Sequence, residues 1–252
     1  MKALLAIGSK HDSTKVGDRW LNSKNSIARL AGLFYLIFIL TFVLASYIRS
    51  QIIVSGDAVA TAHNISINEL LFRLGFVTEI ISALFFVLAA WALYVLLKPV
   101  NKDIALLFLL LNLGGVVVEC INMLNMFAAV QLLSGADYLN VFTADQLQAQ
   151  ALMHLNLYSS GIVLAQIFFS AWLLPLGYLV YRSGFLPKLL GILLIIDFFG
   201  VLSWFLQVFL LPGYPVISYP GFAVSFIAEV SITLWLLVKG VKDNEQAPTE
   251  AG

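Results

Sequence analysis

Long apolar segments alternate with short polar ones along the chain. The apolar segments cover residues 28–48, 70–97, 104–133, 152–181, 189–211 and 219–238. Each segment, at about 20 residues or more, is long enough to cross a bilayer as a helix. The ten-residue alternating strands typical of an outer-membrane barrel are not seen. The pattern therefore predicts an all-α polytopic membrane protein, a bundle of six transmembrane helices.

Two of the polar connections contain recognisable stop and start signals. The sequence "TADQ" at 143–146 predicts a helix start, with Thr143 as the N-cap and Gln146 at the third helical position. Pro212, Gly213 and Pro215 predict a tight turn between the last two apolar segments. Short connections of this kind join antiparallel neighbours, so we expect a series of helical hairpins.

The basic residues predict the orientation of the chain in the membrane. Lys and Arg close to membrane spans are retained on the cytoplasmic side. Twelve of the 14 Lys and Arg lie before or at the start of the first segment, after the last, or in the connections following the second and fourth, and the other two are Arg49 and Arg73. We therefore expect a cytoplasmic tail at 1–26, a transmembrane domain at 27–240 and a second cytoplasmic tail at 241–252.

Composition excludes several classes of protein. The chain of 252 residues is 61% hydrophobic and 11% charged, whereas soluble domains are about 25% charged. Membrane lipid is therefore an expected partner. The net charge is zero, so there is no overall positive field to attract nucleic acid. The sequence indicates neither a cofactor nor an oligomeric state.

Four stretches in particular carry a resemblance to a known family. They are "ARLAGLFYLI" at 28–37, "GDAVATAHNI" at 56–65, "LLSGADYL" at 132–139 and "LLPLGYLVYRSGFLPKLLGILL" at 173–194. In these the chain resembles a bacterial family known as domain-of-unknown-function family 4386. The resemblance implies a multi-pass protein of the bacterial cytoplasmic (inner) membrane. It implies no activity and no catalytic residues.

Acidic side chains occur inside four of the apolar segments. They are Glu79, Glu119, Asp197 and Glu229. A carboxylate at the centre of a membrane helix costs about 2.5–3.5 kcal/mol, so each requires a reason. At helical rise all four lie roughly 15–21 Å from the outer end of their segments. We therefore expect them to converge on one acidic pocket near the bilayer centre that opens to the outside.

Other polar residues share helix faces with these carboxyls. At about 100° per residue, Asn112 and Asn122 fall on the face of Glu119, whereas Asn125 drifts off it. Ser225 and Thr233 each lie four residues from Glu229. The candidate ligand-binding residues, with Glu119 and Glu229 first, are completed by Glu79, Asp197, Asn112, Asn122, Ser225 and Thr233, and by His154 and Arg73 at the outer mouth.

Three functional hypotheses follow from this pattern. In the first, the pocket binds or translocates a proton, a cation or a small polar solute. In the second, the protein is structural, and protonated carboxyls hydrogen-bond between helices at about 0.6–2 kcal/mol each. The third is an intramembrane lipid-modifying enzyme. It has no motif to support it, because H-E-x-x-H and G-x-S-x-G are absent and only three His occur, so no catalytic residue and no metal is assigned.

Overall fold

The computed structural model describes the backbone of residues 2–241 and the side chains of residues 23–241. All regular elements in that range are helical, and the prediction of an all-α fold is confirmed. The elements are α1 (Lys2–Ile52), α2 (Ala58–Ile67), α3 (Glu69–Leu97), α4 (Lys102–Asn122), α5 (Leu124–Leu132), η1 (Asp137–Leu139), α6 (Ala144–Arg182), α7 (Lys188–Leu210), η2 (Pro215–Ser218), α8 (Tyr219–Leu234) and the π-helical turn η3 (Trp235–Lys239).

Six helical segments within the described residues are long and apolar enough to cross a membrane. They are Ser23–Ile52, Glu69–Leu97, Lys102–Leu132, Ala144–Arg182, Lys188–Leu210 and Pro215–Lys239. Each contains or closely follows one of the six apolar segments that the sequence predicts. The chain is therefore an all-α polytopic bundle, as expected for a multi-pass membrane protein.

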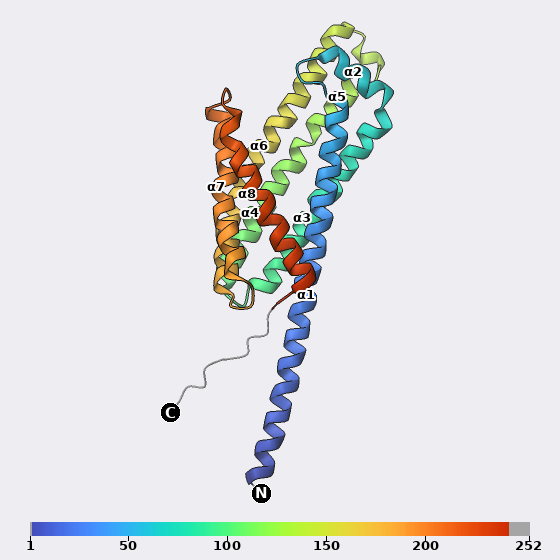
Figure 1. Ribbon diagram of the computed structural model, residues 1–252. Coiled ribbons are helices and arrows are strands. Elements are labelled where there is room, and N and C mark those ends of the chain that lie inside the picture. The colour runs from blue at the N-terminus through green and yellow to red at the C-terminus, as the bar shows by residue number, and fades with distance from the viewer. Residues whose placement is uncertain (1, 242–252) are drawn as a thin grey trace.

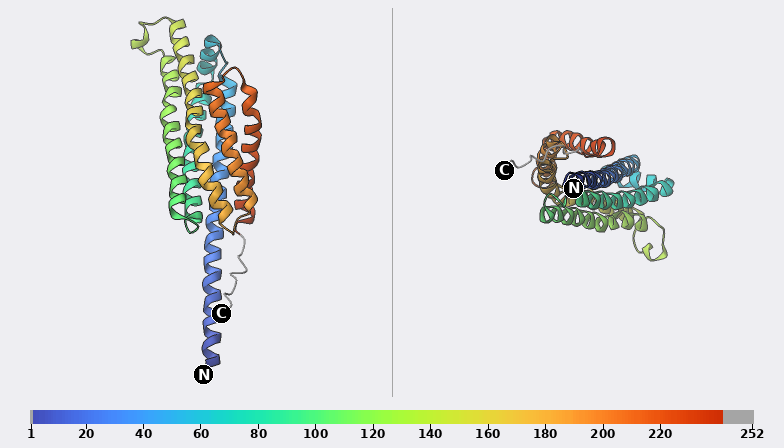
Figure 2. Two further views of the ribbon diagram at one scale, coloured as in Figure 1. Left: turned by 90° about the vertical axis from the view of Figure 1, so that its left-hand side faces the viewer. Right: turned by 90° about the horizontal axis from the view of Figure 1, so that it is seen from below.

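The six spans form a ring in which neighbours in sequence are neighbours in space. α1 packs on α3, α3 on α4, α4 on α6, α6 on α7 and α7 on α8, and η3 closes the ring against α1 (Figures 1 and 2). α1 extends beyond the bundle at the end where η3 lies, which we call the terminal end. The opposite end, formed by α2, η1 and η2, is the loop end. There α7 and α8 lean away from α1 (Figure 1).

Glycines allow α6, α7 and α8 to approach one another closely. A Cβ on Gly191 of α7 would lie 2.6 Å from backbone atoms of Gly177 and Tyr181 in α6. A Cβ on Gly221 of α8 would lie 2.6 Å from the carbonyl oxygen of Gly200 in α7. Small residues permit such contacts between membrane helices, where tight packing replaces the hydrophobic effect. These three helices therefore form one closely packed unit.

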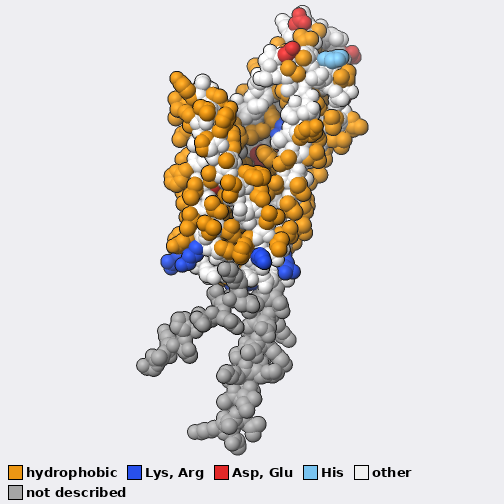
Figure 3. Space-filling view, viewed as in Figure 1, with side chains coloured by type: hydrophobic (Ala, Val, Ile, Leu, Met, Phe, Trp, Pro, Cys, Tyr) orange, Lys and Arg blue, Asp and Glu red, His pale blue; other side chains and the backbone are white. Residues whose placement is uncertain are grey.

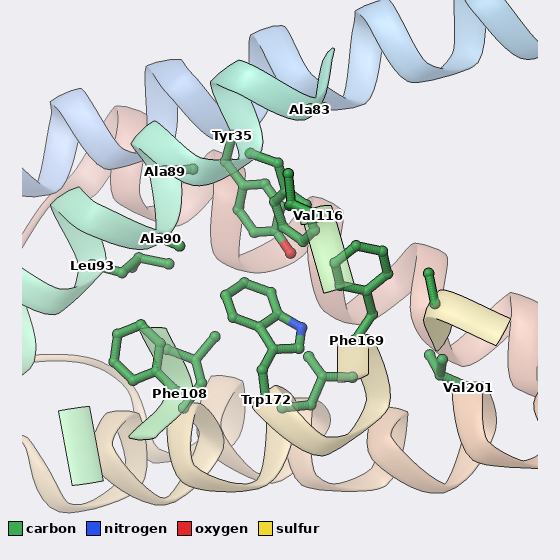
Figure 4. Packing of buried hydrophobic residues seen from close by; sticks show 14 of the residues in the cluster. Tyr35, Ala83, Ala89, Ala90, Leu93, Phe108, Val116, Phe169, Trp172 and Val201 are labelled. Atoms are coloured by element: carbon green, nitrogen blue, oxygen red, sulfur yellow. The ribbon is translucent and has the colours of Figure 1, made fainter. Parts of the chain in front are cut away.

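An aromatic cluster joins this unit to α1, α3 and α4 nearer the terminal end. Trp172 of α6 lies edge-on to Phe86, at 5.1 Å between ring centroids. It also lies edge-on to Phe108, at 6.2 Å (Figure 4). Tyr35 of α1 stacks on Phe86 at 6.0 Å. Edge-to-face and offset arrangements are the favourable ones for aromatic pairs. The cluster holds the ring together where its helices are closest.

The third span, Lys102–Leu132, runs without a break as the sequence pattern predicts, with one irregular turn inside it. α4 ends at Asn122 and α5 begins at Leu124, with Met123 between them. The N–H of Met126 donates to the Met123 carbonyl at 3.0 Å, a tighter turn than an α-helix makes. The irregularity is confined to this turn, because the N–H of Phe127 also donates to the Met123 carbonyl, at 3.3 Å, as in an α-helix.

The start of α6 agrees with the sequence. The Thr143 hydroxyl accepts a hydrogen bond from the Gln146 N–H at 3.3 Å, and the Gln146 side chain accepts one from the Thr143 N–H at 2.9 Å. This reciprocal arrangement is a capping box. The predicted N-cap is confirmed.

Candidate functional site

A cavity of about 240 Å³ lies between α1, α3, α4, α6, α7 and α8. Two carboxyls, Glu119 and Glu229, line it, together with the polar side chains of Gln166 and Ser225. The rest of the lining is apolar and predominantly aromatic. The aromatic members are Phe38, Phe42, Phe86, Phe169, Trp172, Trp204, Phe222 and Phe226.

Glu119 and Glu229 face this cavity without a partner from the protein. Glu119 is only 7% exposed, and Glu229 is partly buried. Neither carboxyl forms a hydrogen bond or an ion pair with another residue in the described part of the chain. A buried carboxyl without a partner is costly, whether it is charged or neutral. The cavity therefore has two acidic groups available to a ligand.

Glu79, by contrast, is fully occupied by contacts within the protein. It lies in α3, is 1% exposed, and accepts hydrogen bonds from the Arg49 guanidinium of α1 and the Tyr158 hydroxyl of α6. Arg49 also donates to the Ser46 hydroxyl at 3.0 Å. The charge of Glu79 is offset by Arg49, and the cluster joins three helices.

A chain of amide contacts continues from Tyr158 towards the loop end. The Asn122 amide donates to the Tyr158 carbonyl at 2.7 Å, and the Asn125 amide donates to the Asn122 side-chain oxygen at 3.1 Å. Nδ1 of His154 lies 3.0 Å from the Asn125 side-chain oxygen. Asn125 is therefore joined to Asn122 and to His154 by side-chain contacts that the sequence analysis did not include.

Three further candidate residues lie in the spans but outside the cavity. Asp197 of α7 accepts a hydrogen bond from Ser225 of α8, and its other carboxyl oxygen is buried without a partner. Asn112 and Thr233 are also buried, and their side-chain polar atoms have no partner within the described residues. None of these three lines the cavity. Only Ser225 connects Asp197 to it.

Arg73 does not lie where the sequence analysis expected it. It pairs with Glu69 at 2.7 Å, one helical turn earlier in α3, and both side chains are about half exposed. The basic residue near the carboxyls is Arg49, which the sequence pattern marks only as flanking the first outer connection. The feature of the sequence that could have pointed to an inward-facing Arg49 is Ser46, a polar residue one turn earlier on the same helix face.

A second, more open cavity continues from the first. It is lined by Arg49, Tyr158 and Ser159 among others, and shares Phe42 and Trp204 with the first. Figure 3 shows the hollow between the two leaning parts of the molecule, with acidic and basic side chains visible inside it. The second cavity lies on the loop-end side of the first, and the two adjoin at Phe42 and Trp204.

The structure thus brings together two of the four carboxyls that were expected to converge. Glu119 and Glu229 share the cavity, whereas Glu79 and Asp197 are not part of its lining. Among the described residues, no three His, Cys, Asp or Glu lie close enough to hold a metal ion. The site consists of two carboxyls, one from α4 and one from α8, that line one cavity together with aromatic side chains.

Comparison with known proteins identifies the family. A family model described as "Domain of unknown function (DUF4386)" matches residues 30–240. The chain belongs to this family. The DUF4386 match includes every residue of the two cavities and of the Arg49–Glu79–Tyr158 cluster.

A protein of Archaeoglobus fulgidus described as "Uncharacterized protein" is similar to this chain. It is 31% identical over 168 residues, which cover 65% of the chain and 82% of the relative. No solved structure matches. A protein similar to this DUF4386 chain therefore occurs in an archaeon. The location of the chain in a bacterial inner membrane stays a prediction.

Proposed function

We propose that the chain binds a proton, a cation or a small polar solute in the aromatic cavity, with Glu119 and Glu229 as its acidic ligands. The observation that supports this is that both carboxyls line one cavity and that neither has a hydrogen-bond or ion-pair partner among the described residues. Ionisable groups inside a membrane bundle commonly mark ion or proton pathways. A cation bound in the cavity that both carboxyls line would offset their negative charge.

The contacts of Glu79 and Asp197 fit the structural hypothesis, in which carboxyls hydrogen-bond between helices. They do not extend that hypothesis to Glu119 and Glu229. The first two accept hydrogen bonds from neighbouring helices, Glu79 from Arg49 and Tyr158 and Asp197 from Ser225. Such contacts stabilise membrane bundles by about 0.6–2 kcal/mol each. We therefore assign these two carboxyls to helix packing and the other two to the ligand.

The proposal includes an orientation for the chain. With both termini in the cytoplasm, the tails at 1–26 and 241–252 lie inside, and the loop end faces outwards. The cavity that contains Arg49 then opens to the outside, and ligand reaches Glu119 and Glu229 from there.

Removal of either carboxyl tests the proposed function. We expect protein extracted gently from membranes to retain a bound cation or solute, detectable by native mass spectrometry with metal analysis. Glu119→Gln and Glu229→Gln preserve shape and hydrogen bonding but remove the acidic group, so each should weaken binding at least about tenfold, equivalent to about 1.4 kcal/mol.

Glu69→Gln is the matched control, because Glu69 is half exposed and pairs with Arg73 away from the cavity. It should bind as the wild type does. If all four forms were equally stable and equally empty in the presence of added cations, the structural hypothesis would replace the proposed function.

A further inference from the structure

The aromatic rings around the carboxyls attract a positively charged ligand, and so do the carboxyls themselves. Trp204 and Phe222 meet edge to face at 5.1 Å between centroids, and both line the cavity. Phe86, Phe169 and Trp172 line its buried side. The face of an aromatic ring carries partial negative charge and attracts cations. Rings and carboxyls therefore select positive charge together.

An inorganic cation would have to keep part of its water shell here. Ca²⁺ takes about six to eight oxygens, and Mg²⁺ requires a nearly octahedral set. Besides the two carboxyls, the side chains that line the cavity offer the Gln166 amide oxygen and the Ser225 hydroxyl oxygen, which makes at most six oxygens even if each carboxyl bound through both of its own. The remaining lining is aromatic and aliphatic, and such side chains solvate alkyl groups rather than hard ions.

We propose that the ligand is an organic ammonium ion, with its charged nitrogen in the cavity that Glu119 and Glu229 line and its alkyl groups against the aromatic rings. This inference rests on the proposed function and names its ligand class. The cavity of about 240 Å³ equals the volume of about eight water molecules, which suits an ammonium with a few short alkyl groups. One ammonium offsets one carboxylate, and a proton on the other carboxyl leaves the site neutral.

The rim of the cavity allows an apolar part of the ligand to extend outwards. Val43 of α1 and Phe226 of α8 both line the cavity, and they are 59% and 70% exposed. The cavity therefore reaches the apolar outer surface between α1 and α8. A larger alkyl group on the ammonium can leave through this opening into lipid.

A pair of probes that differ only in charge tests the ligand class. Choline and 3,3-dimethylbutan-1-ol have the same shape, with nitrogen in one and carbon in the other. Isothermal titration calorimetry on the full chain, in a detergent without ammonium groups, should show that choline binds and that the neutral alcohol binds at least about tenfold more weakly.

Variants of the rings separate cation–π attraction from the effect of the carboxyls. Phe222→Leu and Trp204→Leu keep apolar volume but remove a ring, and each should weaken choline binding by about two- to thirtyfold. Phe199→Leu is the matched control, because Phe199 of α7 is 61% exposed and lies outside the cavity. It should leave choline binding unchanged.

Failure of this inference can be distinguished from failure of the proposed function. If the neutral alcohol bound as tightly as choline, the ammonium assignment would be overturned. The same holds if choline did not bind while an inorganic cation bound to the wild type and not to Glu119→Gln, a result that leaves the proposed function intact. If no cation distinguished the wild type from Glu119→Gln, both proposals would fall.

Discussion

Arg49 and Glu79 differ in what each can do when its partner is removed. A carboxyl left alone in an apolar site can take up a proton and become neutral, whereas a guanidinium keeps its charge. We therefore expect Glu79→Gln, which leaves Arg49 charged and uncompensated, to lower the free energy of unfolding by about 3 kcal/mol. Arg49→Gln should cost less. Thermal and denaturant unfolding of the purified variants measures both losses.

The double variant Arg49→Gln with Glu79→Gln provides the control for this asymmetry. It removes both charges and leaves two amides that can hydrogen-bond with each other and with Tyr158. We expect it to be more stable than Glu79→Gln alone, because no buried charge remains without a partner. A double variant less stable than either single one would show that the Arg49–Glu79 pair is not compensated in this way.

Helix contacts through glycine predict which substitutions the bundle tolerates. Gly191→Ala in α7 would place a methyl group against backbone atoms of α6, which can move only if the two helices separate. We expect a loss of about 1–3 kcal/mol in the free energy of unfolding. Gly114→Ala is the control, because its methyl group would lie 3.1 Å from the Phe168 ring, which can turn aside. Similar losses in both variants would argue against close packing of α6 on α7.

The elements that the sequence predicts well are those set by the bilayer or by local hydrogen bonds. The apolar segment at 189–211 corresponds to α7, Lys188–Leu210, because membrane thickness dictates its length. Thr143 and Gln146 form their cap within four residues. By contrast, Glu119 and Glu229 lie on helices far apart in sequence, and only the closing of the ring brings them to one cavity.

The contacts that the sequence analysis missed also have physical causes. Arg49 lies near the end of a span, where a basic residue normally reads as an interfacial flank, so its contact with Glu79 leaves little trace in the pattern. The contacts of Asn125 with Asn122 and with His154 of α6 depend on side-chain directions, which positions counted along one helix do not give. Both concern contacts between side chains, which the pattern of polar and apolar positions along a single helix does not record.

In the whole molecule, the distribution of charge gives the two ends of the bundle different character. Lys98, Lys102, Arg182 and Lys188 lie in the connections of the terminal end, and basic side chains are visible there in Figure 3. The η1 and η2 connections of the loop end contain no Lys or Arg. Since basic residues are retained in the cytoplasm, the loop end is predicted to face outwards.

Cysteine labelling tests this orientation, because the chain has only Cys120 and a Cys120→Ser variant removes it. Asp137→Cys at the loop end and Lys102→Cys at the terminal end each introduce one exposed thiol. On intact cells, a membrane-impermeant maleimide should label the Asp137→Cys variant and leave the Lys102→Cys variant unlabelled until the membrane is opened. The reverse result would place the termini outside. The proposed path past Arg49 to Glu119 and Glu229 would then open to the cytoplasm, and the ligand would have to come from the cell's interior.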